Sequence, residues 1–252
     1  MASSADSPGQ VPFNDLSRTP PPLAAEIADA IARVVASGWY VLGPEHDAFE
    51  QELADYLGSD HAVALGNGTD ALELSMLALG VEPGDTVMTV ANAGGYSSVA
   101  ARLLGAEPVF ADISPDTLLM SVETATQALD ALPSPPKVLV VTHLYGAMAP
   151  VAELVELAHS RGIAVLEDVA QAIGARAGGR AAGTFGDIGT TSFYPTKNLG
   201  ALGDGGAIVT SRPELAAAVR SLRQYGWTSK YRIGRARAAT AVSTNCKPRF
   251  CG

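Results

Sequence analysis

The chain has 252 residues, of which 47% are hydrophobic and 17% charged, and its formal net charge is −9. This composition is typical of a globular protein and excludes a largely disordered chain. The acidic balance, without a basic block, argues against nucleic acid as a partner. No apolar run reaches the roughly 18–20 residues that a membrane span needs, and the polar start "MASSADSPGQ" does not resemble a signal peptide, so we expect a cytoplasmic protein.

The first elements in the chain are expected to be helical. Residues 1–10 are predicted to be a disordered leader, and residues 11–235 one large domain. After "RTPPP", apolar residues at helical spacing predict one helix. The stretch "GPEHDAFEQELADYLG" predicts a second, with Phe49, Leu53, Tyr56 and Leu57 on one face.

Strands and helices then alternate to the end of the domain. Strands are expected at 61–65, 85–90, 107–113, 137–144, 163–168, 187–194 and 205–211. Helices are expected at 69–80, 96–105, 122–131, 151–162 and 213–226. Apolar strands separated by helices of about ten residues predict an α/β fold, a mainly parallel sheet with helices on both faces.

Three motifs directly follow predicted strands: "GNGTDAL" (66–72), "EDVAQA" (167–172) and "SFYPTK" (192–197). Ligands of such sheets bind beyond the carboxyl ends of the strands, so the three motifs are expected to converge on one site. In "GNGTDAL" the glycines and the helix start favour an anion, with the Thr69 hydroxyl as an added donor. The alternative is a plain turn capped by Thr69 or Asp70.

Asp168 and His143 each lie at the end of a predicted strand, and each allows two interpretations. Asp168 ends an apolar strand, where a carboxylate is costly unless it is paired, and a protonated ring nitrogen would be a suitable partner. It is otherwise a helix cap. His143, in "THLYG", either orients a ligand or is a hydrogen-bonded structural histidine.

Lys197 is isolated among Tyr194, Pro195 and glycines, with no other lysine between Lys137 and Lys230. A desolvated lysine can form Schiff bases, whereas an ordinary loop lysine stays solvated. Ser192 is near enough in sequence to donate to a phosphate. A phosphate cradle, a buried carboxylate, one lysine and a stacking aromatic such as Tyr96 together match what pyridoxal phosphate needs. We predict no metal site.

At these motifs the sequence resembles the DegT/DnrJ/EryC1/StrS sugar aminotransferases, from "VPFNDL" at 11–16 to "RQYGW" at 223–227. The resemblance implies a fold-type I, pyridoxal phosphate-dependent enzyme and a homodimer with its site at the subunit interface. It implies that Lys197 forms the Schiff base and shuttles the proton, and that Asp168 pairs with the pyridine nitrogen. Gln171 is expected at the phenolic oxygen, and Tyr96 on the ring, although "ANAGGYSS" departs from the family's wording. The phosphate ligands are expected to be Gly68, Thr69 and Ser192.

The substrate that the resemblance implies is a nucleotide-linked keto-sugar, with glutamate as amino donor. The residues of these motifs are closest to those of enzymes that act on 3-keto-6-deoxyhexoses. Two other functions stay open. One is sugar dehydration, which a few members of the family perform. Those members have a histidine in place of the Schiff-base lysine, so Lys197 argues against dehydration. The other is a non-catalytic cofactor-binding or regulatory protein.

The tail "ATAVSTNCKPRFCG" (239–252) departs from the resemblance, because the family continues with a G-x-N-x-R-x-D-E-x-Q-A-A segment and then a small domain. A back-translation of the tail, read with one extra base before it, gives "GNSRLDELQAAVLR". We therefore expect residues 236–252 to be an unstructured tail from a frameshift in a longer aminotransferase gene. Such a chain would lack the small domain and be weakly active or inactive, and Cys246 and Cys251 would have no redox role.

Overall fold

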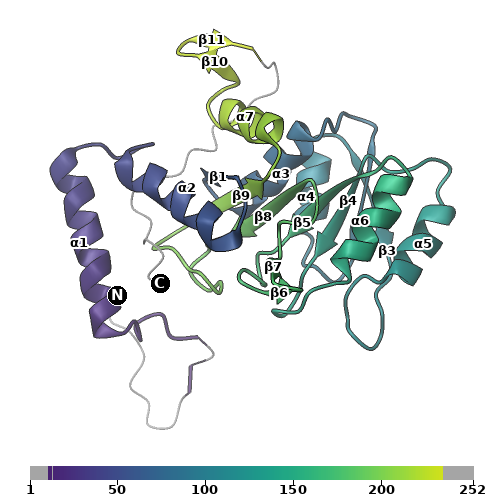
Figure 1. Cartoon of the computed structure of the whole chain (residues 1–252), viewed down its shortest axis with the longest axis horizontal. Helices are drawn as coiled ribbons and strands as arrows, with labels where there is room; N and C mark the ends of the chain where they lie inside the picture. Colours follow the sequence, from purple (N-terminus) through teal and green to yellow (C-terminus); the bar gives the residue numbers. More distant parts are fainter. Residues whose placement is uncertain (1–10, 13, 235–252) are drawn as a thin grey trace.

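The computed structural model describes residues 11–12 and 14–234. The leader expected at 1–10 and the tail expected at 236–252 lie outside these residues. The main sheet consists of β1 (His61–Leu65), β2 (Thr86–Val90), β3 (Glu107–Ala111), β4 (Val138–Thr142), β5 (Ala164–Asp168), β8 (Ile188–Ser192) and β9 (Gly206–Thr210). Their order across the sheet is β1-β9-β8-β5-β4-β2-β3, and Figure 1 shows this sheet at the centre of the molecule.

One strand of the seven runs against the others. β9 pairs antiparallel with β1 on one side and with β8 on the other, whereas the pairs among β2, β3, β4, β5 and β8 are parallel. Because β9 is antiparallel to both β1 and β8, these two strands run in the same direction. The mainly parallel sheet is confirmed, and the carboxyl ends of all strands except β9 meet at one edge.

Helices cover both faces of the sheet, as expected. One face packs against α3 (Gly68–Ala78), α4 (Tyr96–Leu103) and α7 (Pro213–Leu222). The other face packs against α2 (Pro44–Leu57), α5 (Val122–Asp130) and α6 (Val151–Ser160). The alternation along β1 illustrates the division: Val63 and Leu65 belong to the first core, whereas Ala62 and Ala64 pack with α2.

The two N-terminal helices form as their sequences predict, with one exception. Helix α1 (Pro21–Ser37) begins in the proline run and ends at Gly38, whose φ of 67° closes the helix in the left-handed conformation. Helix α2 buries Phe49, Leu53 and Leu57. Tyr56, expected on the same face, is 46% exposed. The buried stripe is shifted toward Ala54, so Tyr56 lies at its margin.

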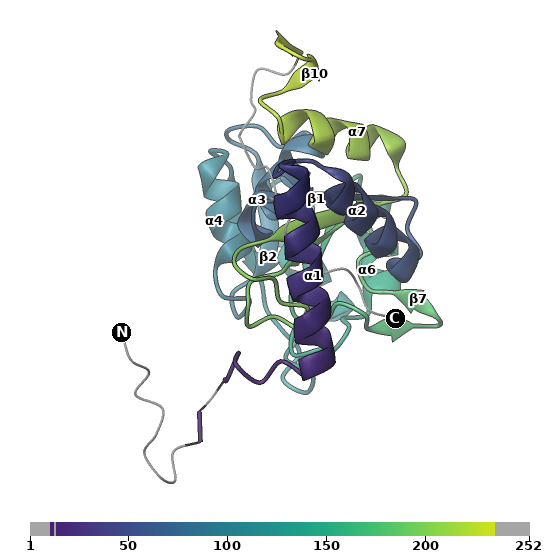
Figure 2. The same cartoon turned by 90° about the vertical axis from the view of Figure 1, so that its left-hand side faces the viewer.

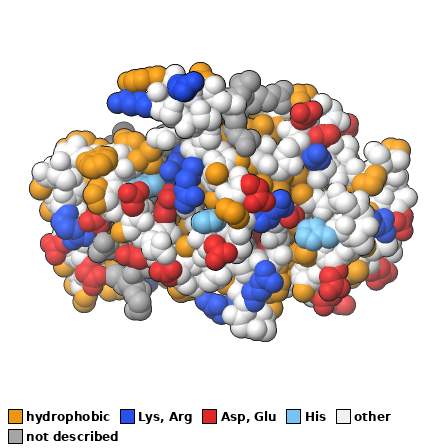
Figure 3. Space-filling model, turned by 45° about the horizontal axis from the view of Figure 1, so that its top comes forward, with side chains coloured by type: hydrophobic (Ala, Val, Ile, Leu, Met, Phe, Trp, Pro, Cys, Tyr) orange, Lys and Arg blue, Asp and Glu red, His pale blue; other side chains and the backbone are white. Residues whose placement is uncertain are grey.

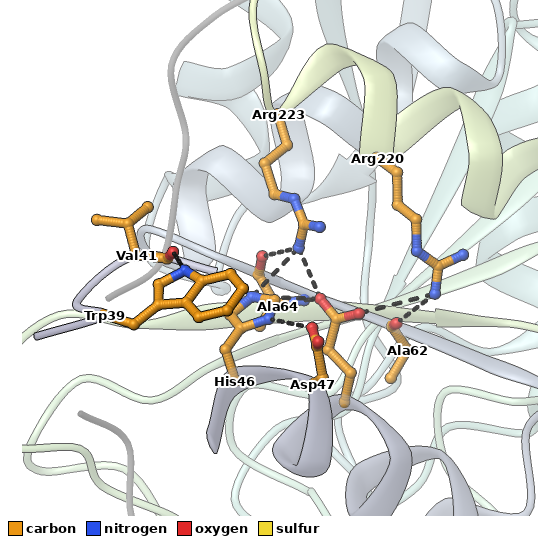
Figure 4. A network of polar contacts seen from close by, with 9 residues as sticks. Trp39, Val41, His46, Asp47, Ala62, Ala64, Arg220 and Arg223 are labelled. Carbon is orange, nitrogen blue, oxygen red and sulfur yellow. Dashed lines mark hydrogen bonds and ion pairs between the residues drawn. The ribbon is translucent and has the colours of Figure 1, made fainter. Parts of the chain in front are cut away.

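The outer edge of β1 is covered by side chains (Figure 4). The N–H of Ala64 donates to Glu50 Oε1 at 2.8 Å, and the carbonyl of Ala64 accepts from Arg223 Nη1 at 3.0 Å. The carbonyl of Ala62 accepts from Arg220 Nη2 at 3.1 Å. Helices α2 and α7 thus satisfy backbone groups that would otherwise be free to pair with another strand.

Two short hairpins were not expected from the sequence. The pair β6 (Arg176–Ala177) and β7 (Arg180–Ala181) turns at two glycines, and the pair β10 (Trp227–Ser229) and β11 (Arg232–Ile233) projects beyond α7 (Figures 1 and 2). Strands of two or three residues are too short to show an alternating pattern.

Charged groups of both signs are interspersed with hydrophobic ones on the face shown in Figure 3. Among the described residues, no helix combines the length and the apolar character needed to cross a bilayer.

Candidate functional site

A cavity of about 540 Å³ opens at the edge of the sheet where the carboxyl ends meet. This volume lies within the range of small-molecule sites. The cavity brings together residues from all three strand-end motifs. Six of the seven residues predicted for the site line it: Gly68, Thr69, Tyr96, Asp168, Ser192 and Lys197. Gln171 is not among the lining residues.

The amino end of α3 forms one wall. Asn67 caps this helix, with its Oδ1 accepting the N–H of Asp70 at 2.8 Å. The plain-turn interpretation expected Thr69 or Asp70 as the cap, and the structure has Asn67 instead. The Thr69 hydroxyl is therefore not used in capping. A Cβ atom at Gly68 would lie 2.6 Å from the Cβ of Ser192. Glycine at this position lets the helix start approach Ser192 closely, which places donors suited to an anion side by side.

Asp168 lies at the end of β5 and is 6% exposed. Its Oδ1 accepts the N–H of Ala170 at 3.0 Å, so the carboxylate does act as a local cap. Within the described part of the chain, Oδ2 has no hydrogen-bond partner. Burial raises the pKa of Asp168, while the hydrogen bond from Ala170 and the charge of Lys197 oppose this rise. A cationic donor in the cavity would favour the ionised form.

Lys197 and Tyr96 come from distant segments and meet at the cavity. The Nζ of Lys197 lies 5.9 Å from the centroid of the Tyr96 ring, within the range of a cation–π contact. The N–H of Lys197 donates to the carbonyl of Tyr194 at 2.8 Å, which closes a turn around Pro195. Gly200 follows, where a side chain would collide with the Pro195 carbonyl. The glycines after Lys197 thus allow close backbone packing around the amine.

Gln171 lies in the turn after β5, beside the cavity wall formed by Asp168 and Ala170. Its Oε1 accepts the backbone N–H of Tyr145 at 3.1 Å. Among the described residues, the amide NH2 of Gln171 has no hydrogen-bond partner.

His143 is a structural histidine. Its Nδ1 accepts the N–H of Ala149 at 3.1 Å, so the ring proton resides on Nε2, which donates to Glu167 Oε2 at 3.0 Å. Both side chains are fully buried. Glu167 also accepts backbone N–H groups from Gly183, Phe185 and Gly186. The His143–Glu167 pair thus holds together the end of β4, the end of β5 next to Asp168, and the segment that leads into β8.

Sequence reasoning missed several lining residues. The cavity also exposes Asp70, Glu73, Thr190, Thr191 and Asp204. Burial raises the pKa values of Asp70 and Glu73, and Asp204 adds to the effect on Asp70. Polar residues in a helix turn or a glycine-rich loop carry no distinctive spacing, so only the fold reveals them. Among the described residues, no group of three or more acidic, histidine or cysteine side chains is arranged to hold a metal ion.

Comparison with known proteins identifies the family. The model of the DegT/DnrJ/EryC1/StrS aminotransferase family matches residues 21–247. The chain belongs to this family. Both the expected family and the expected fold are thereby confirmed.

Two curated relatives and one solved structure of the family are similar over most of this chain. The erythromycin biosynthesis sensory transduction protein EryC1 of Saccharopolyspora erythraea is 44% identical over 88% of this chain and 60% of its own. The dTDP-3-amino-3,4,6-trideoxy-alpha-D-glucose transaminase of Streptomyces venezuelae is 43% identical over 92% of this chain and 60% of its own. The crystal structure of ntda from Bacillus subtilis with bound cofactor pmp superposes with a TM-score of 0.87, at 29% identity, over 98% of this chain and 56% of that one. The chain thus spans about 60% of the length of these relatives.

Proposed function

We propose that this protein is the cofactor-binding part of a pyridoxal phosphate-dependent aminotransferase acting on a nucleotide-linked keto-sugar. The observation that carries the proposal is the convergence of an anion-binding helix start, a buried carboxylate and a lysine beside an aromatic ring in one cavity. The transaminase and the cofactor-bound structure among its relatives support the same reaction class.

The lining residues suit each part of the cofactor. Gly68, Thr69 and Ser192 would hold the phosphate, with the α3 dipole favouring its charge. Asp168 would pair with the pyridine nitrogen, and Tyr96 would stack on the ring. When bound, the cofactor supplies an electron-accepting ring and an aldehyde that takes up the amino group.

The residues of this chain would position the reactants and move the proton. The Lys197 amine would bond to the aldehyde and, once released, carry the substrate proton. Ionised Asp168 would keep the pyridine nitrogen protonated. Its one donor within residues 11–12 and 14–234, the Ala170 N–H, leaves one carboxylate oxygen for that nitrogen. Burial makes this interaction stronger than it would be in water.

The substrate and assembly are proposed from the family. A 3-keto-6-deoxyhexose linked to a nucleotide is the preferred substrate, glutamate the donor and a homodimer the assembly. The charges that line the cavity support a homodimer. Lys197 is the one lysine or arginine among its described lining residues, against Asp70, Glu73, Asp168 and Asp204. A bound phosphate would need further donors, which a neighbouring subunit can supply.

The test begins with pyridoxal phosphate and the purified chain. Its absorbance should show covalent capture of the cofactor, and borohydride followed by peptide mapping should place the label on Lys197. Lys197→Ala should abolish labelling, while the control Lys230→Ala should not. A label on Lys137 or Lys230 in the unmodified chain would contradict the assignment.

Addition of glutamate then separates catalysis from binding. Conversion of the bound cofactor to its amine form supports an aminotransferase. Cofactor capture without any response to glutamate or to a nucleotide-linked amino sugar would instead favour the non-catalytic alternative. The similarity to EryC1, which is described as a sensory transduction protein, makes this alternative a specific competitor.

A further inference from the structure

The loop before α4 holds two glycines in succession, within the segment "ANAGGYSS". Gly94 and Gly95 have φ values of 77° and 78°, in the left-handed region that favours glycine. Gly95 has a clear structural task, because it is the N-cap of α4 and its carbonyl accepts the N–H of Val99 at 2.9 Å. Gly94 stands outside the helix, so its presence calls for a separate explanation.

The space beside Gly94 is filled by the ring of Tyr96. A Cβ atom built on Gly94 would lie 2.9 Å from Cε2 and 3.3 Å from Cδ2 of that ring. Two carbon atoms in contact prefer a separation of about 3.5–4.0 Å. The ring therefore occupies the volume that any side chain at position 94 would need.

The start of the helix explains why the ring lies there. Tyr96 is the first residue of α4, and the Cα–Cβ bonds of a helix tilt toward its amino end. The side chain of Tyr96 thus points back over the loop that precedes the helix. It also lines the cavity, with its ring centroid 5.9 Å from Lys197 Nζ. Tyr96 is 56% exposed, so the ring is not enclosed in a core that could hold it without the loop.

We propose that Gly94 is a positioning residue, whose bare Cα leaves the space in which the Tyr96 ring turns back toward Lys197 to stack on the cofactor. This inference rests on the proposed function, because it takes pyridoxal phosphate as the ligand. Gly94 is not among the described lining residues of the cavity, so it acts through Tyr96. The double glycine thereby explains how a chain that departs from the family's wording in this loop still brings an aromatic ring to the site.

The experiment is a double-mutant cycle on the affinity of the full chain for pyridoxal phosphate, followed by absorbance. Gly94→Ala should weaken binding at least tenfold, because its methyl group displaces the ring. Tyr96→Ala should weaken binding as well. In the Tyr96→Ala background the methyl group has no ring to displace, so adding Gly94→Ala should change the affinity less than twofold.

A matched control isolates the strain of alanine in the left-handed region. Gly162, in the turn after α6, has a φ of 71°, and a Cβ atom there would meet nothing within 4 Å. Gly162→Ala should lower the melting temperature but leave the affinity within twofold of the parent. Gly94→Asn is a second variant at the site, because asparagine tolerates the left-handed region better than alanine while still carrying a Cβ.

A second measurement needs no cofactor. In the cofactor-free chain with isotope-labelled tyrosine, the ring signals of Tyr96 are assigned by their loss in Tyr96→Ala. They should shift in Gly94→Ala and Gly94→Asn but not in Gly162→Ala. Circular dichroism of each variant confirms that the fold is retained.

The outcomes separate the two proposals. If the parent chain captures the cofactor on Lys197 but Gly94→Ala weakens binding equally in both backgrounds, or the Tyr96 ring signals do not move, the role of Gly94 is refuted and the proposed function stands. If the parent chain does not capture the cofactor at all, both proposals fail.

Discussion

Single residues at the site trade stability for binding. Asp168 is a buried carboxylate that accepts the Ala170 N–H, and Gly68 is a position where a methyl group has no room. Each has a direct consequence that substitution can measure.

Asp168→Asn should stabilise the cofactor-free chain at pH 7 while abolishing amino transfer. Burial raises the pKa of Asp168 above 3.8 in the folded state. The folded chain thus binds the proton more tightly than the unfolded chain, and stability falls as the pH rises from about 4 through the raised pKa. Asparagine keeps the acceptor for Ala170 without the charge. Thermal melts should show a gain of a few degrees, roughly 2–4 °C per kcal/mol, that shrinks toward pH 4.

Gly68→Ala should lower cofactor affinity and cost about 1–3 kcal/mol of unfolding free energy, because its Cβ overpacks against Ser192. The double variant Gly68→Ala/Ser192→Gly makes room for the methyl group. It should recover most of the stability, measured by denaturant unfolding, without recovering phosphate binding. Equal recovery of both would show that the close approach serves packing alone.

The sequence predicted the site residues with distinctive contexts and missed the others. Lys197 was predicted because it is isolated among glycines, and Asp168 because it ends an apolar strand. The contact between Tyr145 and Gln171 depends on a positive φ at Tyr145 that no spacing encodes. The cap at Asn67 depends on the register of one helix turn.

At the level of elements, the outer edge of β1 is held by a network of polar contacts. Arg223 is 7% exposed, and its Nη1 bonds to Glu50 Oε1. It also bonds to His46 and to the Ala64 carbonyl, as Figure 4 shows. Loss of one member leaves buried charge uncompensated and backbone groups open to another chain.

Glu50→Ala should cost about 3–5 kcal/mol of unfolding free energy, because it removes the carboxylate facing buried Arg223 and the acceptor for Ala64 N–H. It should also promote association through the uncovered strand edge. Chemical denaturation and light scattering measure the two effects. Glu123→Ala, on the exposed surface of α5, is the matched control and should change neither.

His46 should make the chain less stable in mild acid. Burial is the main cause that lowers its pKa below 6.5, with Arg223 acting in the same direction and Glu50 against it. A lowered pKa means that the unfolded chain binds the proton more tightly, so stability decreases as the pH falls through about 6.5 toward the folded value. His46→Gln should flatten this part of the stability profile.

The whole molecule exposes apolar surface beside its cavity. Tyr96, Val99 and Leu103 on α4 are 56%, 52% and 63% exposed. Leu103 and Tyr96 also line the cavity, so this helix face is continuous with the proposed site. A subunit interface at the cavity would bury it.

Val99→Asp should therefore weaken self-association at least tenfold in sedimentation equilibrium, because a carboxylate at a buried interface costs free energy without a partner. Phe110→Asp, on β3 and similarly exposed, is the control. Dimers that tolerate both substitutions equally would place the interface elsewhere.

The overall architecture was predictable because each strand and helix of the main layers carries its own pattern. The strand segment "KVLVVTHL" contains a run of four apolar residues, and helices α1, α2 and α7 begin at proline. The reversal of β9 was not predictable in this way, because "GGAIVTS" is equally suited to either direction. Strand direction is set by pairing partners that lie far apart in sequence.

That reversal has a consequence for the order in which the protein is made. β1 has β9 as its neighbour, with His61 beside Thr210 and Leu65 beside Gly206. As synthesis proceeds from the amino end, β1 must wait for β9, and so for nearly all of the described chain, before it can pair with the sheet. The strand that leads into the Asn67–Gly68 wall of the cavity therefore joins the sheet late in synthesis.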